Sequence, residues 1–206
     1  IVSDKYDLII FIGDYVDAYQ FEDTQVLTNL LDIIQYKIDN FDKVILLWGN
    51  HDLQYLFSYS THGCSGYRSN MYHQLHDVYN INKHLFKVAH QIDNYLWTHA
   101  GVSEAWYNKF LQIASSDLEG NLADKLVQTF NSSKEWIITQ VGASRGGLRG
   151  DFGGPLWADA SETQFSSKKG FVQIVGHTPQ RKITTFGNYT YCDVLQHTKE
   201  GYILEI

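Results

Sequence analysis

Four short apolar runs, each followed at once by a polar motif, constrain the fold of this chain more than any other feature of its sequence. Each run has the length and composition of a strand that is buried on both faces. The motifs place aspartate, asparagine and histidine at the carboxyl ends of these strands, where ligands bind in open α/β sheets. We therefore expect the four motifs to meet at one sheet edge. The runs and their motifs occupy residues 9–12 with 13–17, 44–47 with 48–52, 95–97 with 98–101, and 172–175 with 176–179.

The segment between the first two runs has the periodicity of an amphipathic helix. Apolar side chains recur at helical spacing over residues 24–40, and Asp23 or Thr24 is the expected N-cap. The order strand, helix, strand predicts a βαβ unit with parallel strands and a right-handed crossover. Such a unit brings Asp14 and Asn50 to the same end of the sheet.

The rest of the chain predicts further helices and strands without a linker, a repeat or a low-complexity segment. We therefore expect a single α/β domain over residues 1–206. Ser103 is the expected N-cap of one helix. The predicted helices cover residues 53–59, 71–88, 103–113 and 121–141. The predicted loops cover residues 61–69 and the glycine-rich segment 142–154. Further strands are predicted over residues 171–175, 182–193 and 201–206, the last two antiparallel.

Composition narrows the class of partner and the compartment. The chain has a net charge of −7 and no long basic run, so we expect neither an extended nucleic-acid partner nor an anionic membrane surface. Cys64 and Cys192 are far apart and lack metal-type spacing, which favours a reducing compartment. The sequence shows no signal peptide and no apolar run of transmembrane length. We therefore expect a cytoplasmic location.

The polar motifs contain the ligand types of a divalent metal site. Asp14, Asn50, His99 and His177 offer oxygen and nitrogen ligands that suit Mn, Fe or Zn. A carboxylate can bridge two ions about 3.5–4 Å apart, and such a pair can activate a water molecule and bind phosphoryl oxygens. A neighbouring histidine, oriented by a carboxylate, could then protonate the leaving oxygen.

Each motif is weak evidence when it is taken alone. A lone histidine near a strand end is more often a structural residue, and we assign the six histidines outside the motifs to that class. Coincidence does not explain four such motifs that each follow an apolar strand.

Together the four motifs resemble those of the calcineurin-like metallophosphoesterases, most closely the branch of the phosphoprotein phosphatases and the bacterial diadenosine-tetraphosphate hydrolases. The resemblance implies an α/β/β/α sandwich with mixed sheets and two divalent metal ions, manganese first among them. By the resemblance, Asp14 would bridge both ions, and Asn50, His99 and His177 would hold the second ion. His51, oriented by Asp17, would be the proton donor to the leaving group.

The sequence departs from the family pattern at two places. The family's Asp-x-His motif is absent from residues 1–13, so we expect it upstream of Ile1 and the domain to be incomplete at its N-terminus. Ala18 and Tyr19 stand where protein phosphatases have Arg-Gly, whose arginine binds the substrate phosphate. Our hypothesis is that Arg145 or Arg149, from the glycine-rich loop, supplies that charge. The alternative is that both are solvated loop residues.

The resemblance implies hydrolysis of phosphate esters by a metal-activated hydroxide, without a phosphoenzyme. We expect a serine/threonine-phosphatase-like phosphomonoesterase whose substrate is a phosphoprotein or a small phosphoester. One alternative is a hydrolase of dinucleoside polyphosphates or other nucleotide phosphoanhydrides or diesters. The other is a non-catalytic scaffold on a phosphoesterase fold.

Overall fold

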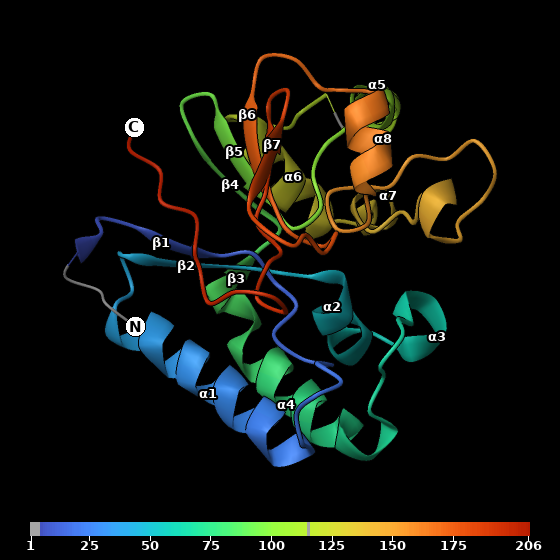
Figure 1. The fold of residues 1–206 in the computed structure, drawn as a ribbon. Helices are drawn as coiled ribbons and strands as arrows, with labels where there is room; N and C mark the ends of the chain where they lie inside the picture. Colours follow the sequence, from blue (N-terminus) through green and yellow to red (C-terminus); the bar gives the residue numbers. More distant parts are fainter. Residues whose placement is uncertain (1–4, 115) are drawn as a thin grey trace. The chain divides into compact units, whose positions relative to one another are not determined.

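The computed structural model describes residues 5–114 and 116–206. The chain forms two compact units, the first ending at Lys87 and the second beginning at Val88, and each is described by itself. Each unit has its own β-sheet and its own helices (Figure 1). The predicted fold class, α/β with mixed parallel and antiparallel strands, is therefore confirmed. The assignment of residues 1–206 to a single domain stays a prediction.

The first unit contains a parallel three-stranded sheet in the order β1-β2-β3. Helix α1 connects β1 to β2, so the predicted parallel βαβ arrangement is present, and Ile9 of β1 pairs with Val44 of β2. The strands of this unit are β1 (Ile9–Phe11), β2 (Val44–Leu47) and β3 (Phe86–Lys87). Its helices are α1 (Asp23–Asp39), α2 (Asn50–Leu56), α3 (Tyr59–His62) and α4 (Tyr72–Asn82), with the 3-10 turns η2 (Ser69–Met71) and η3 (Lys83–Leu85).

Helix α1 forms as its periodicity predicted and buries Leu30 and Ile34 of the expected apolar face, together with Val26. Leu31 and Ile38, which the periodicity placed on the same face, are exposed. Its N-cap prediction is wrong. Glu22 occupies the N-cap position and makes no side-chain cap. Asp23 lies inside the helix, where its carboxylate binds the guanidinium of Arg68.

Three other predictions in the first unit need correction. The short helix expected from residue 53 begins already at Asn50, because the turn at Gly49 is closed by the Asp52 carboxylate, which accepts the Gly49 N–H at 2.8 Å. The long helix expected over residues 71–88 ends at Asn82, and β3 follows it. The predicted exposed loop 61–69 begins with the end of α3 and contains Cys64, whose side chain is buried.

The second unit contains a mixed five-stranded sheet in the order β4-β5-β6-β8-β7. Its three central strands, β5, β6 and β8, are parallel, and each outer strand is antiparallel to its neighbour. The strands are β4 (Ala89–Ile92), β5 (Tyr95–Thr98), β6 (Val172–Val175), β7 (Thr184–Phe186) and β8 (Tyr189–Tyr191). The helices are α5 (Glu104–Ile113), α6 (Leu122–Phe130), α7 (Glu135–Ile138) and α8 (Ala160–Phe165), with the 3-10 turn η4 (Ala143–Arg145).

Ser103 caps α5 as predicted, because its hydroxyl accepts the N–H of Trp106 at 3.2 Å. The helix expected over residues 121–141 is interrupted and forms α6 and α7. Residues 182–193 contain the β7–β8 hairpin, whose strand β8 is parallel to β6. Residues 201–206 form no strand, contrary to the prediction.

The four apolar runs are β1, β2, β5 and β6, and all four are strands as predicted. They belong to two sheets, because β4 pairs antiparallel with β5 and starts a new sheet. The prediction of one common sheet edge is therefore wrong. None of the helices within residues 5–114 and 116–206 has the length and apolarity needed to cross a membrane.

Candidate metal and catalytic site

The loop after β1 holds Asp14 in a strained conformation. Asp14 has a φ of 60°, in the left-handed region that non-glycine residues rarely adopt. The Asp14 and Tyr15 N–H groups donate to the two carboxylate oxygens of Asp52, at 2.9 and 3.0 Å. The His51 N–H donates to Asp14 Oδ1 at 3.1 Å and so orients the carboxylate. These bonds fix Asp14 against the first turn of α2.

Asp52 is the residue that joins the two loops, and sequence reasoning gave it no role. It is completely buried and also accepts hydrogen bonds from the Gly49 N–H and from the Tyr79 hydroxyl, at 2.8 and 2.6 Å. Burial and the charge of Asp14 raise the pKa of Asp52 to about 7, although the hydrogen bonds from Tyr79, Gly49 and Asp14 lower it. Its position at the end of the motif 48–52 was the signal that could have identified it.

Two glycines allow the loops after β1 and β2 to approach each other. A Cβ on Gly49 would overlap the Asp14 carboxylate, and a Cβ on Gly13 would overlap the Gly49 backbone. Gly13 also has a φ of 92°. Any side chain at either position would push the loops apart.

His51 and Asp17 form the pair that the sequence predicted. His51 Nδ1 lies 3.1 Å from Asp17 Oδ2, and the His51 side chain keeps 22% of its surface exposed. Asp17 is buried and also accepts hydrogen bonds from the Tyr55 hydroxyl and the Gln54 amide. Burial lowers the pKa of His51, but the bond to Asp17 and the nearby carboxylates outweigh it, so the net pKa is raised. The pair therefore favours a protonated imidazole.

Asn50 opens α2 and is buried. Its side-chain amide donates to the thiol of Cys64, with Nδ2 and Sγ 3.3 Å apart. The Cys64 thiol in turn donates to the backbone carbonyl of Asn50 at 3.3 Å. Because the amide nitrogen faces Cys64, the carboxamide oxygen faces the opposite way.

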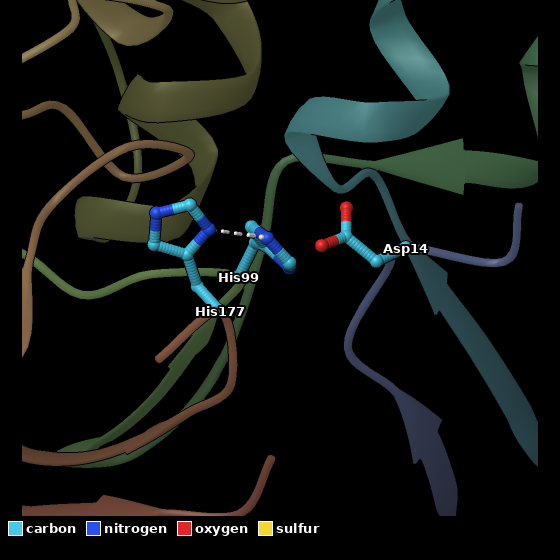
Figure 2. A group of neighbouring side chains, drawn as sticks. All are labelled: Asp14, His99 and His177. Carbon is cyan, nitrogen blue, oxygen red and sulfur yellow. Dashed lines mark hydrogen bonds between the residues drawn. The ribbon is translucent and has the colours of Figure 1, made fainter. Parts of the chain in front are cut away.

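In the second unit, His99 and His177 follow the adjacent parallel strands β5 and β6. Figure 2 shows their imidazoles joined by a hydrogen bond between His99 Nε2 and His177 Nδ1, 3.1 Å apart. The Gly176 N–H donates to the His99 carbonyl at 2.7 Å and holds the two strand ends together. Two imidazole nitrogens that converge in this way can bind the same divalent ion.

Backbone strain is concentrated at the predicted site residues. Among the residues that the structure describes, four non-glycine residues have a positive φ, and Asp14, Asp17 and His177 are three of them. Such strain persists only where surrounding contacts enforce it, and it is common at functional sites. It supports the choice of these three positions.

The structure distinguishes between the two arginines proposed to bind phosphate. Arg145 donates to the Thr178 hydroxyl at 2.8 Å, one residue after His177, and its Nε lies 2.8 Å from Asp159. Arg149 is exposed on the glycine-rich loop. Of the two, Arg145 is therefore the one with an observed contact to the turn that carries His177.

Another arginine, to which sequence reasoning gave no role, contacts the backbone of Ala18, the position at which an arginine was expected by the resemblance. Arg68 donates to the carbonyl oxygens of Ala18 and Phe21, at 2.7 and 2.9 Å, and binds the carboxylate of Asp23. These contacts give it a structural role in the loop after Asp17. The Asp-x-His motif expected upstream of Ile1 lies outside the described residues.

The donor types fit a divalent metal in each unit. The first unit offers the Asp14 carboxylate and the Asn50 carboxamide, both held by backbone or side-chain contacts. The second offers the convergent imidazoles of His99 and His177. This oxygen and nitrogen set suits ions such as Mn, Fe or Zn.

Comparison with known proteins extends these observations to the whole chain. The sequence pattern of the calcineurin-like phosphoesterases matches residues 1–203. A search of curated proteins found no significant match.

Two solved structures share the fold. One is a cold-active protein tyrosine phosphatase determined at 1.1 Å, with 17% identity and a TM-score of 0.57. The other is the cold-active protein-tyrosine phosphatase of a psychrophile, Shewanella sp., with 17% identity and a TM-score of 0.56. Each match covers 90% of this chain, which spans 58% and 59% of the length of the two structures. On the match to residues 1–203, the chain belongs to the calcineurin-like phosphoesterases, a family of metal-dependent phosphoester hydrolases.

Proposed function

We propose that this protein is a metal-dependent phosphomonoesterase that resembles the serine/threonine phosphatases. The His51–Asp17 pair is the observation that carries the proposal. An imidazole with a raised pKa, held by a buried carboxylate and partly exposed, suits protonation of a leaving oxygen. A phosphomonoester with a poor leaving group needs that proton more than a phosphoanhydride does.

In this proposal Asp14, Asn50, His99 and His177 hold two divalent ions, of which manganese is the expected metal. When bound, the ions supply Lewis acidity toward the attacking water and the phosphoryl oxygens. His51 Nε2 donates the proton while Nδ1 remains hydrogen-bonded to Asp17. Arg145 is the better candidate for the residue that binds the substrate phosphate, since it contacts the turn after His177, whereas Arg149 is exposed on the glycine-rich loop.

The substrate, partner and location are part of the same proposal. A phosphoprotein or a small phosphomonoester is the expected substrate. The described thiols, Cys64 and Cys192, are both free, which supports the reducing environment of the cytoplasm.

Hydrolysis by chelator-stripped protein tests the function. We expect manganese to restore hydrolysis of an aryl phosphomonoester, with much slower cleavage of the matching diester and of a dinucleoside polyphosphate. Asp14→Asn should abolish the manganese-dependent activity. Preference for the diester or the polyphosphate would replace the proposal with a nucleotide hydrolase. Manganese binding without any turnover would favour a scaffold.

A further inference from the structure

Two buried residues of the first unit connect the proposed metal ligand Asn50 to the His51–Asp17 pair, the proposed proton relay. Gln54 is completely buried on α2, and Cys64 has 7% of its surface exposed. Neither residue belongs to the four sequence motifs. Both make hydrogen bonds to side chains that the proposed reaction uses.

Cys64 contacts Asn50 through its thiol. The sulfur accepts a hydrogen bond from the side-chain amide nitrogen of Asn50 and donates one to the backbone carbonyl of Asn50, each at 3.3 Å. An asparagine amide can rotate by half a turn and exchange its oxygen and nitrogen, so a ligand oxygen needs a partner that selects one orientation. The acceptor sulfur selects the orientation in which the nitrogen faces Cys64.

Gln54 contacts Asp17 through its amide nitrogen, which donates to the same carboxylate oxygen that binds His51. The Gln54 oxygen accepts the backbone N–H of Cys64 at 2.9 Å. Both ends of the Gln54 amide are therefore satisfied, and its orientation is fixed by the Cys64 backbone. The thiol of Cys64 takes no part in that bond.

We propose that Cys64 and Gln54 are two separate positioning residues, Cys64 for the metal ligand Asn50 and Gln54 for the Asp17–His51 relay. This inference deepens the proposed function and rests on it. The thiol bonds to the Asn50 amide and the Asn50 backbone carbonyl and makes a longer contact, at 3.5 Å, to the His62 carbonyl. Because Asn50 is the proposed site residue among these partners, removal of the thiol should weaken metal binding and leave proton donation intact. Loss of the Gln54 amide should weaken proton donation and leave metal binding intact. A role in packing alone would not separate these effects.

The test compares Cys64→Ala, Cys64→Ser and Gln54→Met, with Cys192→Ala as the matched control. Cys192 lies in the second unit, and within the described part of the chain its thiol makes a single long contact, to the Thr190 carbonyl. Manganese affinity is measured on chelator-stripped protein by electron paramagnetic resonance of the free ion. Proton donation is measured from kcat for a series of phosphomonoesters whose leaving groups differ in pKa, at saturating manganese.

We expect Cys64→Ala to weaken manganese binding by about 10-fold or more, the size of effect that partners of metal ligands have. Its dependence on the leaving group should match that of the unmodified protein. Cys64→Ser retains a donor and an acceptor and should recover part of the affinity. Gln54→Met should bind manganese normally and lose most rate with the poorest leaving groups. Cys192→Ala should change neither quantity.

Wild-type manganese affinity in Cys64→Ala would overturn the role of Cys64, and an unchanged leaving-group dependence in Gln54→Met would overturn that of Gln54. If both variants lose both properties together, the residues act by packing and the inference is wrong. Failure of the proposed function looks different, because the unmodified protein itself would then show no manganese-dependent hydrolysis. If Cys64→Ala does not fold, Cys64→Ser replaces it in the test. Wild-type manganese affinity in Cys64→Ser, together with wild-type competition by alkaline-earth ions, would then overturn the role of the thiol.

Discussion

Replacing Tyr79 by phenylalanine tests whether the hydrogen bonds to the buried Asp52 carboxylate stabilise the first unit. Tyr79 is completely buried on α4, and its hydroxyl donates to Asp52 Oδ1 at 2.6 Å. Phenylalanine keeps the ring and therefore its contacts with Trp48 and Phe86. The variant thus removes one hydrogen bond and little else.

The magnitude follows from the burial of the acceptor. A hydrogen bond to a charged group contributes about 1.5–3 kcal/mol, and water does not reach Asp52 to replace the lost donor. The remaining donors, the N–H groups of Gly49, Asp14 and Tyr15, keep the carboxylate partly satisfied. We therefore expect the free energy of unfolding to fall by about 2 kcal/mol at pH 8.

The pH dependence has a definite sign. When the pKa of an acid is higher in the folded than in the unfolded state, the free energy of unfolding of the protein falls as the pH rises between those two pKa values. The Tyr79 bond lowers the pKa of Asp52, which is about 7, so its removal raises that pKa further. The variant should therefore differ most from wild type above pH 7, and the difference should shrink as the pH falls below 7.

Urea unfolding in chelator at pH 6 and pH 8 measures both effects. Tyr72→Phe is the control, because among the described residues the Tyr72 hydroxyl makes one long contact, at 3.5 Å, to the Phe57 carbonyl. It should change the free energy of unfolding by less than about 0.5 kcal/mol at either pH. A loss of less than about 0.5 kcal/mol for Tyr79→Phe at pH 8, with an unchanged denaturant slope, would refute the reasoning.

Three further outcomes follow from the site. Gly49→Ala should lower the free energy of unfolding by at least about 2 kcal/mol in urea, since its Cβ overlaps Asp14, whereas Gly201→Ala meets no atom and should be neutral. Arg145→Ala should raise KM for a phosphomonoester by about 10-fold or more, and Arg149→Ala should not; equal effects would remove the distinction between them. Manganese should raise the melting temperature of the chelator-stripped protein, and Asp14→Asn should lose that response; a response that survives the substitution would mean that the metal binds elsewhere.

The sequence predicted the parts of the fold that have strong local patterns. The four apolar runs became strands, and Ser103 capped its helix, because these features depend on neighbouring residues alone. Strand β3 has only two residues, too few to show a period, so it was absorbed into a predicted helix. The separation into two sheets depends on the pairing of β4 with β5, which no local pattern specifies.

The same limit explains why the loop after α3 was taken to be exposed. Its polar and glycine-rich composition is typical of a surface loop. The structure buries Cys64 because its partners are side chains of α2, and Gly66 lies against the Asp17 backbone with a φ of 78°. These are tertiary contacts, and composition does not report them.

The start of α2 decides how much of the site can be understood from sequence. A helix that begins at Asn50 places Asn50 and Gln54 one turn apart, and both contact Cys64. His51 and Tyr55 are also one turn apart, and both reach Asp17. A start at residue 53, as predicted, leaves the motif outside the helix and hides both relations. The residues proposed to bind metal and donate a proton were thus visible in the motifs. The residues that contact them follow from the helical phase, which the buried Asp52 carboxylate sets at Gly49.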